Sequence, residues 1–91
     1  MDYGKCKQEL DALAAGWDDH PENMKQHDEN WVCVRFPKSM WRIAKAVGAE
    51  KDGYWGWILW NKSVQDNGSN FAVEVQKIAW KYGLYASERQ L

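Results

Sequence analysis

The sequence predicts a small α+β domain in which about three helices pack on a short antiparallel sheet of two or three strands. Three observations predict it: a three- and four-residue apolar repeat near the start, alternation at 31–36, and an aromatic run at 54–60. A chain of 91 residues has the size of one domain, so we expect residues 1–91 to fold as a single unit. Its hydrophobic fraction of 45% and charged fraction of 27% are typical of globular proteins, not of disordered ones.

The first element is expected to be an amphipathic helix. Its apolar residues fall on one stripe at a period of 3.6 residues, and they are Tyr3, Cys6, Leu10, Leu13, Ala14 and Trp17. Asp2 is placed to cap the helix, while Gly16 and the His20-Pro21 pair are placed to end it.

Residues 18–30 are polar apart from Met24 and predict a loop that is either functional or mobile. This acidic loop has five acids and one lysine, a net charge of -4, whereas residues 31–51 have five bases and one acid, a net charge of +4. The two segments either face each other or present opposite charges to a partner. We expect the loop to contribute a secondary partner contact through Asp18, Asp19, Asp28 and Glu29.

Residues 31–36 are rich in β-branched and aromatic side chains and alternate as a half-buried strand does. Pro37 suits a first helical turn, and a second helix is expected to follow it and to end at Gly48. The helix is expected to bury Met40, Ile43, Ala44 and Val47. Its opposite side carries Lys38, Arg42 and Lys45, with Trp41 at the boundary.

Residues 54–60 form the most apolar window of the chain and predict a central strand, because Gly53 and Gly56 disfavour a buried helix there. As a strand, the window places Trp55 and Trp57 on one face and Trp60 on the other. Residues 66–70 predict a turn.

Residues 71–82 fit a helix that Gly83 ends, although 71–75 also alternate as a strand would. The helix is favoured because the apolar stripe persists for more than three turns. The tail at 87–91 is expected to fray.

Several classes of function are disfavoured by composition. No run reaches the roughly 18 apolar residues that span a bilayer, and the N-terminal residues do not resemble a secretory signal, so we expect a cytoplasmic protein without membrane contact. Two cysteines, Cys6 and Cys33, are expected to be free thiols in a reducing compartment. A net charge of -1 gives no strong overall attraction to nucleic acid.

Neither a metal site nor a catalytic site is expected, and we expect no cofactor. The soft ligands Cys6, His20, His27 and Cys33 lack the close pairing typical of zinc modules. The histidines have acidic neighbours, but no nucleophile motif, phosphate loop or paired carboxylates accompany them. The chain is therefore expected not to be an enzyme.

Residues 40–57 resemble the helix-turn-helix pattern of DNA-binding regulators. Ala44, Gly48, Tyr54 and Trp57 match the small residue, the turn glycine and the following apolar positions of that pattern. The resemblance implies binding of duplex DNA, with the Asn67-Gly68 turn as the tip of a winged variant. The matching recognition helix would hold two glycines and three tryptophans, with few polar side chains to contact bases.

Seven tryptophans are more than a domain of this size is expected to bury, because each indole N–H needs a partner in the interior. Trp41 and Trp80 lie off the buried stripes of their helices, and exposed Trp beside Arg is typical of protein-binding hot spots. We therefore expect a non-catalytic interaction module, in the style of small inhibitors and accessory proteins of phages and mobile elements. Its expected contacts with a larger protein or protein–nucleic acid complex are Lys38, Trp41, Arg42, Lys45 and Trp80, beside the acidic loop.

Overall fold

The structure is a computed structural model that describes residues 1–20, 22, 28–66 and 70–90. Within these ranges, three α-helices pack on a four-stranded antiparallel sheet, which confirms the predicted α+β class and adds one strand to the largest number expected. The elements follow the chain as α1 (Tyr3–Asp18), β1 (Asp28–Arg35), the 3-10 helix η2 (Lys38–Met40), α2 (Trp41–Ala46), β2 (Glu50–Asp52), β3 (Gly56–Asp66), α3 (Asn70–Lys81) and β4 (Tyr85–Gln90).

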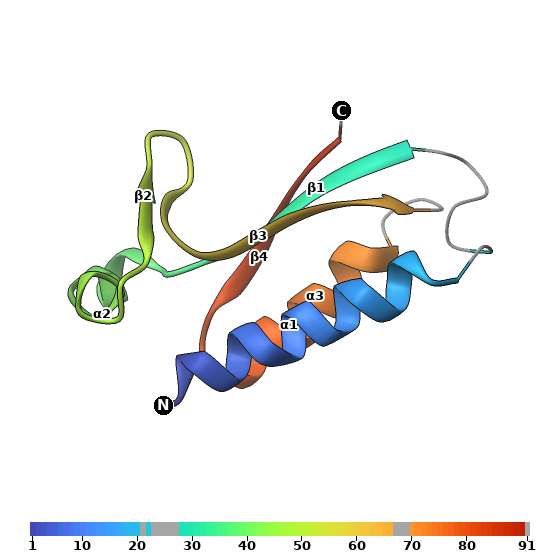
Figure 1. Cartoon of the computed structure of the whole chain (residues 1–91). Coiled ribbons are helices and arrows are strands. Elements are labelled where there is room, and N and C mark those ends of the chain that lie inside the picture. Colours follow the sequence, from blue (N-terminus) through green and yellow to red (C-terminus); the bar gives the residue numbers. More distant parts are fainter. Residues whose placement is uncertain (21, 23–27, 67–69, 91) are drawn as a thin grey trace.

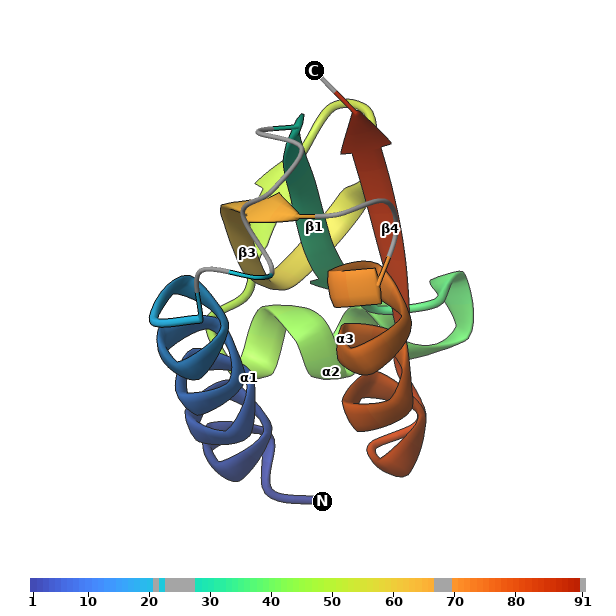
Figure 2. The same ribbon diagram turned by 90° about the vertical axis from the view of Figure 1, so that its right-hand side faces the viewer.

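The strands lie in the order β2-β3-β1-β4, and each neighbouring pair is antiparallel. Helices α1 and α3 lie side by side against one face of the sheet (Figure 1). Figure 2 shows α1 beneath β3 and α3 beneath β4. The short α2 lies at one end of the sheet, beyond the two longer helices. The segments at both ends of the described chain, α1 and β4, are therefore integral parts of one two-layer domain.

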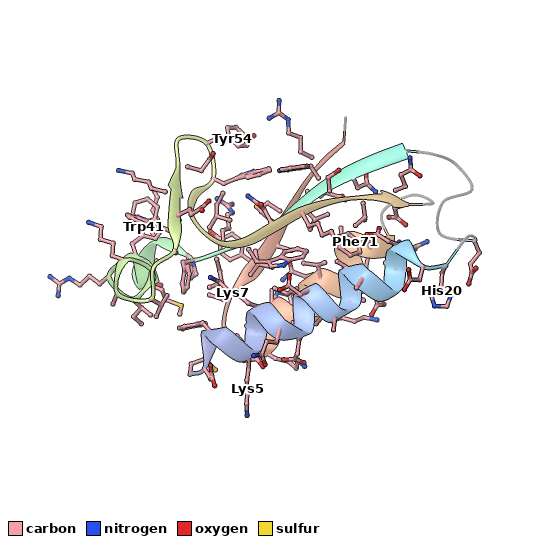
Figure 3. The ribbon with its side chains drawn as sticks, viewed as in Figure 1. Lys5, Lys7, His20, Trp41, Tyr54 and Phe71 are labelled. Carbon is pink, nitrogen blue, oxygen red and sulfur yellow. The ribbon has the colours of Figure 1, made fainter. Side chains whose placement is uncertain are left out.

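The core fills the space between the sheet and the two long helices. Its fully buried side chains come from both helices, from the sheet and from the residues that follow β1 and α3. They include Cys6, Leu10, Ala14, Val32, Val34, Phe36, Phe71, Val75, Ala79 and Leu84. Trp17 and Trp60 pack around Phe71, with ring centroids 5.6 and 6.3 Å from it. Figure 3 shows Phe71 between the sheet and the helices. The predicted stripes of the first and last helices therefore form most of the helical side of the core.

The start of α1 and the end of α3 lie where the sequence predicts them, whereas α1 continues through Gly16 and ends at Asp18. The side chain of Asp2 accepts a hydrogen bond from the backbone N–H of Lys5 at 3.2 Å and caps α1. Helix α3 ends where Gly83 adopts a φ of +71°, and the N–H of Leu84 then returns to the carbonyl of Ala79 at 3.0 Å. The helical alternative for residues 71–82 is thus confirmed over Asn70–Lys81.

Strand β3 is longer than expected and contains an irregularity that changes the placement of tryptophans. Val34 pairs with Trp60, whereas the next residue of β1, Arg35, pairs with Ile58. This bulge places Trp60 on the helix side together with Trp57, where both pack against the core. The expectation that Trp55 and Trp57 share one face, opposite Trp60, is therefore wrong. Trp55 precedes the strand, in the turn that joins β2 to β3.

Two strands were absent from the sequence expectation. Residues 87–90 belong to strand β4, so the prediction of a frayed tail at 87–91 is wrong for these residues, while residue 91 lies outside the described ones. The three-residue β2 forms a hairpin with β3. In the described part of the chain, no helix has the length and apolar character that crossing a membrane requires.

Candidate functional site

The second helix differs from its prediction in both length and burial. It is divided into η2 and the six-residue α2, and of its predicted buried stripe only Ala44 is buried. Met40 is half-buried, and Ile43 and Val47 are exposed. The expected stripe is wrong because α2 is short and lies at the end of the sheet, where a single turn reaches the core.

Trp41, the predicted centre of the partner-binding face, holds the local structure together. Its indole N–H donates to the carbonyl of Phe36 at 3.3 Å. A Cβ atom added to Gly56 would lie 3.1 Å from the Cζ2 atom of Trp41, so the indole ring packs closely on the start of β3 (Figure 3). Gly56 also has a φ of +77°, which glycine adopts without strain. Trp41 is 36% exposed, so part of its side chain is available to a partner.

The basic residues of this region remain exposed beside Trp41. Lys38, Arg42 and Lys45 are all exposed, and the Lys45 Nζ lies 5.6 Å from the ring centroid of Trp57. The structure thus brings the four predicted residues of this face to one end of the molecule. It holds Trp41 more rigidly than a free aromatic anchor.

The predicted acidic loop is shorter than residues 18–30. Asp18 is the last residue of α1 and forms an ion pair with Lys62 of β3 at 3.4 Å, and Asp19 is exposed at the helix end. Asp28 and Glu29 already belong to β1, and their side chains lie outside the described part of the structure. Residues 21 and 23–27 of this predicted loop also lie outside it.

Trp80 is the most exposed of the tryptophans assigned to a partner, with 68% of its surface accessible. Val73, two turns earlier on α3, is 51% exposed. Between α3 and β4 runs a groove of about 330 Å³, which we call the α3–β4 groove. Residues of both elements line it: Ala72, Val73, Gln76, Lys77, Trp80, Ala86, Ser87 and Glu88.

The outer edge of β4 borders this groove. Strand β4 ends the strand order, and among the described residues no strand pairs with its outer side. The N–H of Ala86 points toward α3, where the Gln76 side chain accepts it at 2.7 Å. Backbone N–H and carbonyl groups point to the same side of a strand at every second residue. Glu88 lies two residues after Ala86, so its N–H and carbonyl also point away from β1. The groove is therefore flanked by the edge of β4 that is unpaired within the described residues. The sequence did not predict this edge, because it did not predict β4.

A second aromatic surface lies on the face of the sheet away from α1 and α3, which we call the outer face. Cross-strand pairing brings its residues together from three strands: Trp31, Cys33, Arg35, Asn61, Ser63, Tyr85, Ser87 and Arg89. The alternation at 31–36 could have placed Trp31 and Arg35 on one face. The partners from β3 and β4 follow from pairing that no local pattern reveals.

The helix-turn-helix expectation is wrong. Residues 56–66 form strand β3 rather than a recognition helix, and Tyr54 and Trp55 lie in the turn before it. The four matching positions therefore come from a short helix followed by a hairpin. The predicted wing tip at Asn67-Gly68 lies outside the described residues.

The soft metal ligands are separated by the fold. Cys6 faces the core from α1, whereas Cys33 lies beneath the outer face of the sheet. His20 follows the end of α1 and lies 3.2 Å from Glu22, and His27 is outside the described residues. Among the residues described, no three of the His, Cys, Asp and Glu side chains cluster closely enough to hold a metal ion.

Both cysteines are expected to be chemically inert in the native protein. Burial raises the pKa of the Cys6 and Cys33 thiols to about 11, so the thiolate at pH 8 is about 100-fold scarcer than in an unfolded chain. We expect neither thiol to react with a disulfide reagent on the timescale of a free cysteine, and both to react after unfolding in guanidinium. Rapid native reaction of either thiol would contradict this burial.

The same pKa shift affects stability at alkaline pH. Because the folded-state pKa exceeds the unfolded value of 9.0, the protonated thiols stabilise the fold fully below pH 9. This contribution is lost as the pH rises toward 11.

Comparison with protein-family models, curated proteins and solved structures gives no significant match to this chain.

Proposed function

We propose that this chain is a non-catalytic protein-interaction module that binds an extended segment of a larger partner protein at the α3–β4 groove. The observation that carries the proposal is the position of Trp80. Its indole is 68% exposed beside an apolar groove, next to a strand edge that is unpaired within the described residues. A tryptophan so placed is typical of residues that a partner covers.

The free edge supports an extended partner segment. A partner strand added to β4 would accept a hydrogen bond from the Glu88 N–H and would donate one to the Glu88 carbonyl. The sheet would thereby gain a strand. Ala86 offers its carbonyl alone, since its N–H is held by Gln76. Backbone hydrogen bonds would supply much of the affinity, and the side chains that alternate along the added strand would supply the specificity.

The groove supports an apolar anchor in the partner segment. The side chains of Ala72, Val73 and Ala86 contribute apolar walls, and Trp80 offers a large rigid surface at low entropic cost. Lys77 is held by Glu74 at 3.0 Å, and Glu88 lies at the other rim, so charges of both signs border the groove. This composition fits a leucine, isoleucine or phenylalanine flanked by polar residues.

In this proposal the chain acts as a small accessory or inhibitory protein of the kind encoded by phages and mobile elements, and it acts in a cytoplasm. Arg42, Lys45 and Lys38 would form a separate charged contact with the same larger complex. The exposure of these three side chains near Trp41 supports that role.

Substitution of Trp80 by alanine is expected to weaken partner binding by about 30-fold or more, as for an interface hot spot worth about 2 kcal/mol. The Glu88→Pro variant removes the outward N–H and should weaken binding comparably, while the pairing of β4 with β1 remains intact. The measurement is the dissociation constant for a partner captured from a bacterial host lysate by the tagged wild-type chain and then purified.

Three variants discriminate between surfaces in this experiment. Lys77→Ala changes a rim residue of the same helix and should have a small effect, which makes it the matched control for Trp80→Ala. Arg42→Ala tests the α2 region: loss of binding there with full retention by Trp80→Ala would contradict the proposed groove. A wild-type dimer that Glu88→Pro abolishes would assign the edge to a second copy of the chain instead.

A further inference from the structure

The outer face of the sheet offers a second binding surface, separate from the α3–β4 groove. Cross-strand pairs arrange its side chains in three rows. The first row is Ser63, Trp31 and Arg89, the second is Asn61, Cys33 and Ser87, and the third is Ile58, Arg35 and Tyr85. Rows with a ring and a guanidinium therefore lie on both sides of a row of small side chains.

The first and third rows are separated by four residues along β1, a distance of roughly 13 Å at the rise of a strand. In the third row, the Arg35 guanidinium lies 4.6 Å from the ring centroid of Tyr85. Arg35 also donates to the carbonyl of Trp55 at 3.2 Å, which ties the β2–β3 turn to the sheet. The Arg35 guanidinium and the Tyr85 ring are thus held against each other before any ligand arrives.

The β2–β3 turn forms the end wall of this surface. Asp52 accepts the N–H groups of Tyr54 and Trp55 at 2.7 and 2.8 Å, and the two rings meet edge to face with centroids 6.1 Å apart. Tyr54 is 84% exposed and points away from the helices (Figure 3). With Arg35, Ser87, Glu88 and Arg89, these rings border a groove of about 740 Å³.

We propose that the outer face binds a short single-stranded nucleic acid, with bases stacked on its aromatic rings and Arg89 contacting a phosphate. Flat rings flanked by guanidinium groups accept the faces of any base, and the hydroxyl and amide groups of Ser87 and Asn61 can meet base edges in the row between. A carboxylate-rich peptide would pair with Arg89 but would leave the exposed Tyr54 ring uncovered. The polar side chains of Asn61 and Ser87 also suit a base edge better than an aliphatic side chain.

The charge of the protein sets the expected strength of this binding. Arg35 and Arg89 are the cations of the three rows, and the net charge of the chain is -1. Affinity should therefore come mainly from stacking. The logarithm of the binding constant should fall only slowly with the logarithm of the salt concentration, with a slope of about -0.7 for the one phosphate contact of Arg89. A duplex presents no unstacked bases and should not bind.

The test is a titration of the full chain with dye-labelled ten-nucleotide oligothymidylate and oligouridylate at low salt, read by anisotropy and by quenching of tryptophan fluorescence. We expect saturable binding with quenching by at least one of the two. Tyr54→Ala should weaken it about 10-fold, since one stacking contact is lost. Arg89→Gln should weaken it several-fold and make the salt dependence shallower.

Trp80→Ala is the matched control, because it removes an exposed ring from the α3–β4 groove and should leave oligonucleotide binding unchanged. It also separates the two proposals, since the proposed protein contact depends on Trp80 and the nucleic acid contact on Tyr54. The inference is overturned if neither oligonucleotide binds, or if duplex DNA or heparin binds equally well with no effect of Tyr54→Ala. Equal binding of a glutamate-rich peptide would assign the face to an acidic protein segment instead.

Discussion

Replacement of Phe71 by alanine is expected to lower the free energy of unfolding by about 4 kcal/mol, which is within the range for a fully buried phenylalanine. The ring is inaccessible to solvent and lies between the rings of Trp17 and Trp60. These two indoles come from α1 and β3, and Trp60 is fixed by a hydrogen bond from its Nε1 to Asp11 at 2.8 Å. Because neighbours so held cannot collapse into the space, the substitution leaves a cavity.

Chemical denaturation followed by tryptophan fluorescence measures this loss, which is a large part of the stability of about 5–14 kcal/mol expected for a domain of this size. In thermal unfolding, a loss of about 4 kcal/mol should lower the melting temperature by about 20 °C. Val73→Ala, two residues later on the exposed side of α3, is the matched control and should change stability by less than about 0.5 kcal/mol. A similar small effect at Phe71 would mean that the ring does not fill the core as described.

The long helices could be predicted because each carries its own periodic signal. The stripe through Cys6 and Leu10 defines α1, and the stripe through Phe71, Val75 and Ala79 defines α3, so local sequence and tertiary packing agree. Trp80 lies outside the second stripe, and its exposure follows from that position alone. These elements determine the class of the fold.

The rest depends on pairing between distant segments. Residues 85–90 have the sequence YASERQ, which lacks the β-branched residues typical of strands, and β4 forms because β1 offers it a complementary edge. The bulge opposite Val34 and Arg35 likewise has no local signal, although it decides which face Trp60 occupies. For the same reason the sequence predicts an exposed Trp80 but not the groove beside it, and Arg35 but not its stacking on Tyr85.

Replacement of Asp66 by alanine is expected to cost about 3 kcal/mol, because two buried donors lose their acceptor at once. Asp66 is fully buried at the end of β3, and its Oδ2 accepts the Phe71 N–H at 3.0 Å and the Asn30 side-chain amide at 3.1 Å. The carboxylate thus joins the first turn of α3 to strand β1. Its negative charge also lies near the positive end of the helix dipole.

Asp66→Asn is the matched control, since it retains one carbonyl acceptor of the same shape and removes the charge. We expect it to lose about half as much stability as Asp66→Ala, measured by denaturation with urea. Native-state hydrogen exchange should show faster exchange at Phe71 and in the first turn of α3 for the alanine variant, because that turn loses its acceptor. If both variants were equally destabilised, the charge rather than the hydrogen bonds would be the source of the stability. A cost below about 1 kcal/mol for Asp66→Ala would mean that water replaces the carboxylate, and that this buried link does not fix α3, with the groove it borders, on the sheet.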